Sequence, residues 1–188
     1  MALMESTMMA LGTPAPDFTL PDAANVNTPV HLSVHATGAR ATLVMFICNH
    51  CPYVVHVVDE LVRLAHDYQP RGLKVVAISS NDVERYPADA PDKMAAFAKT
   101  HGFTFPYCYD ETHDVARAYD AVCTPDFFLF DAELKLAYRG RLDGSRPKSG
   151  TPVTGEDMRE ALDLILAGDP VPEEMQVPSA GCSIKWKR

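Results

Sequence analysis

Two cysteines separated by two residues are the feature of this sequence best suited to chemistry. They lie in the stretch FICNHCPYVV, residues 46–55, where Cys48 and Cys51 enclose His50 and Pro52 follows. Such a pair can form and break a redox disulfide, can supply two ligands to a zinc ion, or can pack as two small apolar residues. The secondary structure predicted around the pair distinguishes among these three uses.

The composition is that of a globular protein with ordinary solubility. The chain has 188 residues, of which 47% are hydrophobic and 22% charged, which favours one domain. The net charge of −8, without a basic block, argues against nucleic acid and anionic membranes as partners. The Met-rich start carries Glu5 and no basic residue, unlike a signal peptide. We therefore expect a cytoplasmic protein with a flexible N-terminus (1–12), a domain (13–168) and a C-terminal tail packed on it (169–188).

The cysteine count favours redox chemistry over a structural framework. Five scattered cysteines do not form the even set typical of a secreted disulfide scaffold, and in a reducing compartment a close pair is catalytic or metal-binding. A zinc site needs two more ligands, and the chain has no second CxxC or closely spaced Cys/His pair. The metal alternative thus depends on Cys108, His113 and Cys123 converging in space. We expect no metal and no cofactor.

The first half of the chain predicts a βαβ unit. The apolar runs ATLVMFI (41–47) and LKVVAIS (73–79) are typical of strands buried on both faces. Between them, apolar residues from Val54 to Tyr68 recur at helical spacing. A strand–helix–strand order requires a parallel pair with a right-handed crossover.

The second half predicts helices and an antiparallel pair. A helix ends at Gly102, and a short strand and a short helix follow in FPYCYD and THDVARAYDA. DFFLFD and KLAYRGRLD then read as two strands joined by a turn, before an amphipathic helix around residues 158–166. With an N-terminal β-hairpin extension, the expected class is α/β, with a mixed central sheet flanked by helices. This is the plan of a thioredoxin fold, although periodicity alone leaves other α/β folds open.

The position of the cysteine pair predicts its chemistry. Cys48 falls where the first strand of the βαβ unit ends, so we expect it at the N-terminus of the following helix. There, unpaired N–H groups and the helix dipole favour a thiolate, the nucleophile of disulfide exchange. Pro52 suits the first turn of a helix. A protonated His50 would stabilise the Cys48 thiolate further.

Four segments resemble the thioredoxin-like redoxins of the alkyl hydroperoxide reductase/thiol-specific antioxidant superfamily. They are GTPAPDFTLPD, MFICNHCPY, CYDETHDVARAYDAVCTPDFFLFDAELKLAYRGRLD and the tail motif GCSIKW, the last being typical of a bacterial subgroup with a CNHCPY centre. The resemblance implies that Cys48 attacks a disulfide and Cys51 resolves the intermediate. It also implies a cis-proline loop at Thr124 and Pro125, where the unpaired backbone edge of Thr124 would bind an extended substrate segment.

The sequence departs from the redoxin pattern at positions that affect the chemistry. Ile47 replaces the tryptophan that thioredoxins carry before the first cysteine, and Thr42 replaces their buried acid. His50, Asp82 or Glu84 would then have to accept the proton of the second cysteine. The Pro and Thr that precede the reactive cysteine of peroxidatic members are missing from LVMFIC.

We therefore predict a thiol–disulfide oxidoreductase that acts on a disulfide-containing protein or small molecule, with an unidentified electron donor. The alternatives are a thiol-dependent peroxidase and a zinc-bound or redox-silent peptide-binding module. The roles of two further cysteines, Cys123 and Cys182, remain open between two alternatives each. Cys123 is either a third thiol near the pair or a packing residue. Cys182 is either a mobile resolving thiol or, as we favour, an anchored residue beside Ile184 and Trp186.

Overall fold

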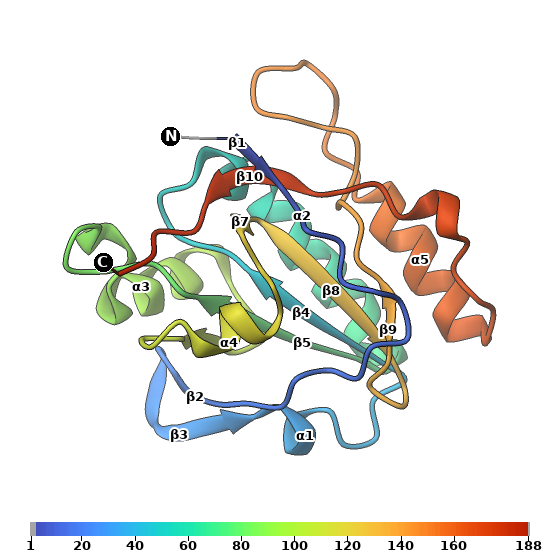
Figure 1. The fold of residues 1–188 in the computed structure, drawn as a ribbon, viewed down its shortest axis with the longest axis horizontal. Coiled ribbons are helices and arrows are strands. Elements are labelled where there is room, and N and C mark those ends of the chain that lie inside the picture. The colour runs from blue at the N-terminus through green and yellow to red at the C-terminus, as the bar shows by residue number, and fades with distance from the viewer. Residues whose placement is uncertain (1–2, 188) are drawn as a thin grey trace.

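A seven-stranded mixed sheet forms the centre of the protein in a computed structural model that describes residues 3–187 (Figure 1). The strand order is β3-β2-β6-β5-β4-β8-β9. Strands β4, β5 and β6 are parallel, and β8 and β9 extend the sheet in antiparallel fashion. The strands are β2 (Thr19–Asp22), β3 (Asn25–His31), β4 (Ala41–Phe46), β5 (Leu73–Ser79), β6 (Tyr107–Tyr109), β8 (Asp126–Asp131) and β9 (Leu136–Tyr138).

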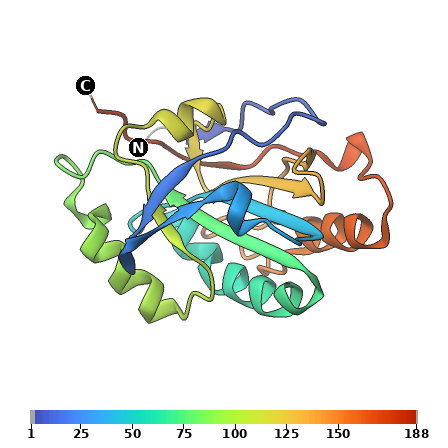
Figure 2. The ribbon, with the colours of Figure 1, turned by 90° about the horizontal axis from the view of Figure 1, so that it is seen from below.

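Helices cover both faces of this sheet (Figure 2). One face carries α2 (Pro52–Tyr68), α3 (Pro91–His101) and α5 (Glu156–Ala167), and the other carries α4 (Asp114–Ala118) with the N-terminal segment. The remaining short helices are α1 (Leu32–His35), η1 (Gln69–Arg71), η2 (Pro87–Asp89) and η3 (Glu173–Met175). The α/β class, the mixed sheet, the flanking helices and the N-terminal hairpin β2–β3 are therefore as predicted.

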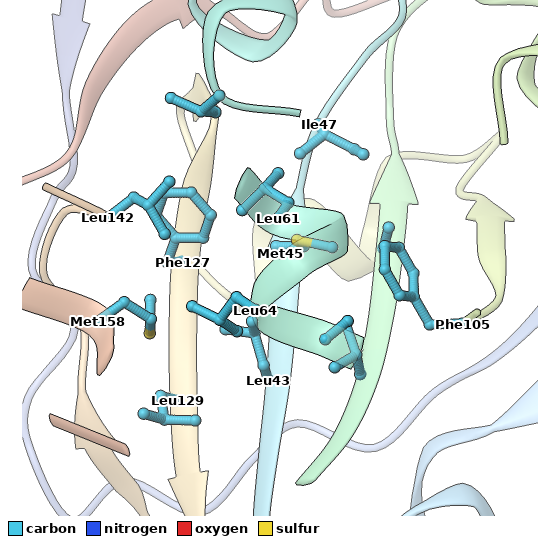
Figure 3. Close-up of a cluster of buried hydrophobic side chains, with 14 of the residues drawn as sticks. Leu43, Met45, Ile47, Leu61, Leu64, Phe105, Phe127, Leu129, Leu142 and Met158 are labelled. Atoms are coloured by element: carbon cyan, nitrogen blue, oxygen red, sulfur yellow. The ribbon is translucent and has the colours of Figure 1, made fainter. Parts of the chain in front are cut away.

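The continuous apolar run of β4 reflects burial on both sides. Leu43 and Met45 point toward α2 and α5, where they join one hydrophobic cluster (Figure 3). Val44 and Phe46 belong to a second cluster, which packs against α4 on the opposite face. Because successive side chains of a strand alternate between faces, a strand with both faces covered must be apolar throughout.

The two ends of the chain meet in a second, smaller sheet. Its order is β1 (Leu3–Glu5), β10 (Ala180–Ser183), β7 (Cys123–Thr124), all antiparallel. In Figure 1, β1 and β10 lie side by side near the start of α2. Residues 3–5, expected in a flexible N-terminus, thus form a paired strand, while residues 1–2 of that segment lie outside the described residues. The C-terminal tail runs back across the domain and supplies β10.

No helix within residues 3–187 is long and apolar enough to cross a membrane.

Candidate redox site

The helix after the cysteine pair begins later than predicted. Helix α2 starts at Pro52, and Cys51 is its N-cap residue, with φ −70° and ψ 121°. Proline fixes its own φ near the helical value and disfavours a helical conformation in the residue before it. Cys48 therefore lies outside the helix, and its predicted place at the helix N-terminus is wrong. The positive end of the helix dipole acts on Cys51 instead.

Both thiols contact Thr124, the residue before the cis-proline. The Cys51 thiol donates a hydrogen bond of 3.2 Å to the carbonyl oxygen of Thr124. The Cys48 sulfur lies 3.6 Å from the Thr124 hydroxyl. The peptide bond between Thr124 and Pro125 is cis, as predicted. Cys48 and Cys51 are both buried, so strand β4, helix α2 and the cis-proline loop enclose the pair.

The pKa values of the two thiols are shifted in opposite directions. The pKa of Cys51 is lowered to about 4, chiefly by the hydrogen bond from the Cys48 thiol, against the effect of burial and with help from Cys182 and the N–H of Val54. The pKa of Cys48 is raised by the same hydrogen bond, by burial and by the charge of Asp89. When the reduced pair loses one proton, these opposite shifts place the negative charge on Cys51, which then no longer donates to Thr124, and leave the remaining proton on Cys48.

A buried carboxylate that sequence reasoning missed lies beside the pair. Asp89 is fully buried, and its Oδ2 lies 2.6 Å from Nδ1 of His50. It also accepts hydrogen bonds of 2.8 Å from the backbone N–H of Asn49 and from the side chain of Asn81. The His50 ring is stacked on Tyr86, with 5.7 Å between ring centroids. His50 thus lies at the site, where its ring contacts a buried carboxylate.

The substrate edge predicted at Thr124 is not free. Thr124 lies in β7, and β10 pairs with it in antiparallel register, with Cys182 opposite Thr124 and Ser183 opposite Cys123. The expectation of an unpaired edge is therefore wrong, because the chain's own tail covers the loop. Pro125 borders a small cavity next to this tail, lined also by Tyr53, His56 and two arginines, Arg141 and Arg146.

Comparison with known proteins places this geometry in a family. The model of the AhpC/TSA family matches residues 11–139, more than half of the chain. The chain belongs to the AhpC/TSA family.

Relatives of this AhpC/TSA protein include structures and enzymes of thiol chemistry. A conserved protein from Geobacillus kaustophilus is 57% identical, with a TM-score of 0.95 over 100% of this chain and 97% of that chain. The thiol-disulfide oxidoreductase ResA of Geobacillus thermodenitrificans is 26% identical over 163 residues, which is 86% of this chain and 81% of ResA. A thioredoxin-family thiol:disulfide interchange protein from Chlorobium tepidum has a TM-score of 0.62 at 21% identity, over 85% of this chain and 99% of that chain. The fold is therefore the thioredoxin fold, and the relatives support a redox enzyme.

Three ligand-type side chains of the AhpC/TSA protein come together at the pair. Cys48, His50 and Asp89 each offer an atom, and these atoms lie within 4.8 Å of one another. Among the residues that the structure describes, these three form the one group of Cys, His, Asp or Glu side chains that are close enough together to hold a metal ion. It differs from the set of Cys108, His113 and Cys123 on which the metal alternative depended.

A topological signal could have found Asp89. The C-terminal ends of the parallel strands β4 and β5 lie at the same edge of the sheet. The polar segment after β5 must therefore start near the cysteines, which follow β4. The sequence offers Asp82 and Glu84 of this segment, beside His50, as candidate proton acceptors. Glu84 is exposed, and Asp82 instead holds the tail, because its N–H donates a 2.7 Å hydrogen bond to the carbonyl oxygen of Lys185.

Proposed function

We propose that this AhpC/TSA protein is a thiol–disulfide oxidoreductase whose redox pair is Cys48 and Cys51. The observation that carries the proposal is the contact of two buried thiols with the same residue of the cis-proline loop, Thr124. Disulfide exchange requires a thiolate that attacks the substrate disulfide and a second thiol that resolves the mixed disulfide. The substrate would be a disulfide-containing small molecule or protein, and an electron donor of the cytoplasm would restore the dithiol.

The proposed reaction begins with a proton transfer within the pair. Cys48 passes its proton to the Cys51 thiolate along their hydrogen bond, and the Cys48 thiolate attacks one sulfur of the substrate disulfide. The other substrate sulfur leaves as a thiolate, and a mixed disulfide forms at Cys48. Cys51 then gives its proton to the departed thiolate and attacks the Cys48 sulfur. This step releases the second substrate sulfur and leaves a Cys48–Cys51 disulfide.

The assignment of Cys48 as the attacking residue follows from what surrounds each sulfur. Cys51 is fully buried and contacts Thr124, the residue that the tail strand β10 covers. Cys48 lies beside His50, whose side chain is 24% exposed. A substrate approaching from the His50 side meets Cys48 first. The thiolate that this attack requires lasts only while Cys51 holds the proton, so Cys51 acts as the base for the first step and as the nucleophile of the second.

Two substitutions test this proposal. Cys48→Ser is expected to abolish the reduction of insulin disulfides by dithiothreitol, and Cys51→Ser to accumulate a mixed disulfide between Cys48 and the substrate. Cys108→Ala is the matched control, because Cys108 is buried in the cluster on the opposite face of the sheet. Retained turnover in Cys48→Ser, with Cys108→Ala at the wild-type rate, contradicts the assignment.

The cluster of Cys48, His50 and Asp89 favours one second candidate. A sulfur, an imidazole and a carboxylate are ligands that zinc accepts, and a bound zinc ion would hold Cys48 as a redox-silent thiolate. The zinc content of the purified protein and titration of its reactive thiols separate the two candidates. One equivalent of zinc with an unreactive Cys48 supports the binding module, whereas a zinc-free protein with a reactive pair supports the oxidoreductase.

A further inference from the structure

The tail strand β10 is fitted closely against the cis-proline loop. A side-chain carbon placed on Gly181 would lie 1.9 Å from the carbonyl oxygen of Thr124, so only a glycine allows the two backbones to approach this far. Ser179 adds a hydrogen bond of 2.7 Å from its hydroxyl to the carbonyl oxygen of Pro125. On the other side, β1 pairs with β10 and places Leu3 opposite Cys182. The strand is thus held from both edges.

This fit brings a third thiol to the redox pair. Cys182 lies opposite Thr124 in the β7–β10 ladder, and Thr124 is also the residue whose carbonyl accepts the Cys51 hydrogen bond. Cys48, Cys51 and Cys182 belong to one buried cluster. The thiols of Cys182 and Cys51 are near enough for each to shift the pKa of the other. Cys51 therefore has two other thiols of the same buried cluster near it.

We propose that Cys182 is a third redox thiol, which exchanges disulfides with Cys51 inside the folded protein; this rests on the proposed redox role of the Cys48–Cys51 pair. In the exchange, the Cys182 thiolate attacks the Cys51 sulfur of the Cys48–Cys51 disulfide. The Cys51–Cys182 bond forms, the Cys48–Cys51 bond breaks, and Cys48 leaves as a thiolate that takes up the proton lost by Cys182. No electron enters or leaves the protein, so no further oxidant or reductant is needed.

The charge on Cys51 controls when Cys182 can react. In the reduced protein, burial and the neighbouring Cys51 raise the pKa of Cys182 to about 12, so it stays protonated. Once Cys51 is part of a disulfide, its negative charge is gone, and the pKa of Cys182 falls. Lys185 lies close enough for its positive charge to favour the Cys182 thiolate. Cys182 is therefore inert beside the reduced pair and gains nucleophilic character beside the oxidised one.

The exchange would return Cys48 to its reduced state while the oxidation is stored in the tail. A Cys51–Cys182 disulfide ties β10 to helix α2, whereas its reduction leaves β10 held only by backbone pairing and packing. An electron donor could then attack the Cys182 sulfur, which lies on a short strand with 5% of the residue exposed. Cys123, the other cysteine of this region, is fully buried and its thiol faces the carbonyl oxygen of Pro125 at 3.8 Å.

The decisive experiment maps disulfides in the wild-type protein. The protein is equilibrated with buffers of reduced and oxidised glutathione at graded ratios, acid-quenched, alkylated and digested for mass spectrometry. The expected result is a Cys51–Cys182 disulfide alongside the Cys48–Cys51 disulfide. If Cys48–Cys51 forms and Cys51–Cys182 is absent at every ratio, Cys182 is a packing residue and the proposal is wrong while the proposed function stands. If neither disulfide forms, the proposed function fails as well.

Variants identify which thiol reacts with Cys51. In Cys48→Ser treated with oxidised glutathione, we expect a Cys51–Cys182 disulfide and no lasting glutathione adduct on Cys51. The double variant Cys48→Ser/Cys182→Ser is expected to keep the adduct, and Cys48→Ser/Cys123→Ala to behave like Cys48→Ser. A lasting adduct in Cys48→Ser, or a reaction that depends on Cys123, overturns the proposal. The wild-type map decides the question if a variant does not fold.

Discussion

The side chain of Asn81 donates a 2.8 Å hydrogen bond to the buried carboxylate of Asp89. The same side chain accepts a 2.8 Å hydrogen bond from the backbone N–H of Lys185 in the tail. One amide group therefore joins the tail to the carboxylate that faces His50, beside Cys48. Asn81 therefore gives one route by which a change in the position of the tail alters the surroundings of Cys48, in addition to the pairing of β10 with Thr124.

The negative charge of Asp89 predicts an effect on Cys48 that can be measured directly. The carboxylate raises the pKa of Cys48, so Asp89→Asn is expected to lower that pKa, on the order of one unit. The pH dependence of iodoacetamide alkylation at Cys48, followed by mass spectrometry, gives the value. Glu84→Gln is the matched control, because it removes an exposed carboxylate from the same segment. An unchanged profile in Asp89→Asn contradicts the electrostatic role of Asp89.

His50 predicts a shift of the opposite sign. When protonated, His50 offsets the charge of Asp89, and its removal leaves that charge acting alone on Cys48. His50→Ala is therefore expected to raise the pKa of Cys48 and to make the Cys48–Cys51 couple more reducing, since the thiolate form is less stabilised. Equilibration with glutathione buffers measures the potential. A couple that is unchanged or more oxidising would show that His50 does not stabilise the Cys48 thiolate.

Gly181 predicts how the tail limits access to the cis-proline loop. An added methyl group would meet the backbone of Thr124, so Gly181→Ala must move β10 away from β7. We expect the free energy of unfolding to fall by roughly 1–3 kcal/mol. We also expect the turnover of insulin to rise relative to that of oxidised glutathione, because the larger substrate needs the uncovered edge. Gly144→Ala is the control, since its new carbon would meet only ordinary contacts, the nearest at 3.5 Å.

Asp126, the residue after the cis-proline, predicts a pH dependence of stability. Burial raises the pKa of this fully buried carboxyl to about 7, whereas an unfolded aspartate titrates near about 3.9. Between these values the native protein holds a proton that the unfolded chain has released. The contribution of Asp126 to the free energy of unfolding therefore falls as pH rises from about 4 to about 7, and is level above that range.

Asp126→Asn removes this dependence. Above pH 7 the variant is expected to be more stable than the wild type, by up to about 4 kcal/mol, and near pH 4 the two should be similar. Urea unfolding at several pH values measures the difference. Asp169→Asn, an exposed carboxylate in the tail, serves as the control and should leave the pH profile unchanged. Parallel curves for Asp126→Asn and the wild type would show that Asp126 does not titrate in this range.

The sheet could be predicted from sequence because burial on both faces leaves a clear pattern. The run at 73–79 coincides with β5, and the run at 41–47 extends one residue beyond β4. The sequence prediction places the start of α2 too early, at Cys48. Pro52 could have indicated the correct start, because proline favours the first helical position and the residue before it is then the N-cap. That one boundary decides which cysteine the helix dipole favours.

The other parts of the site depend on tertiary contacts that leave little trace in the sequence. Asp89 is one of several acids in a polar segment, and only the path of the chain brings it to His50. Strand β10 is formed by Ala180–Ser183, four small residues without a strand pattern. Their pairing with β7 exists because Gly181 permits close approach. The tail motif GCSIKW contains Cys182, but only the folded chain places Cys182 opposite Thr124.

The charges around Cys48 predict a preference for disulfides over hydrogen peroxide. Rapid attack on peroxide requires fixed donors that polarise the hydroperoxide as well as a thiolate. The largest charges acting on Cys48 are those of Asp89 and Cys51, both negative. The chain also lacks Pro and Thr in the stretch before Cys48. Cys48 and Cys51 both contact Thr124, an arrangement that suits resolution of a mixed disulfide by Cys51.

We therefore expect the reduced protein to react much faster with oxidised glutathione than with hydrogen peroxide at equal concentration. Stopped-flow measurement of the change in fluorescence of the single tryptophan, Trp186, or of thiolate absorbance, gives both rates. Asp89→Asn sharpens the comparison, because losing a negative charge near Cys48 should speed both reactions without supplying a donor for peroxide. If hydrogen peroxide reacts as fast as the disulfide in the wild type, the peroxidase replaces the oxidoreductase as the function of this site.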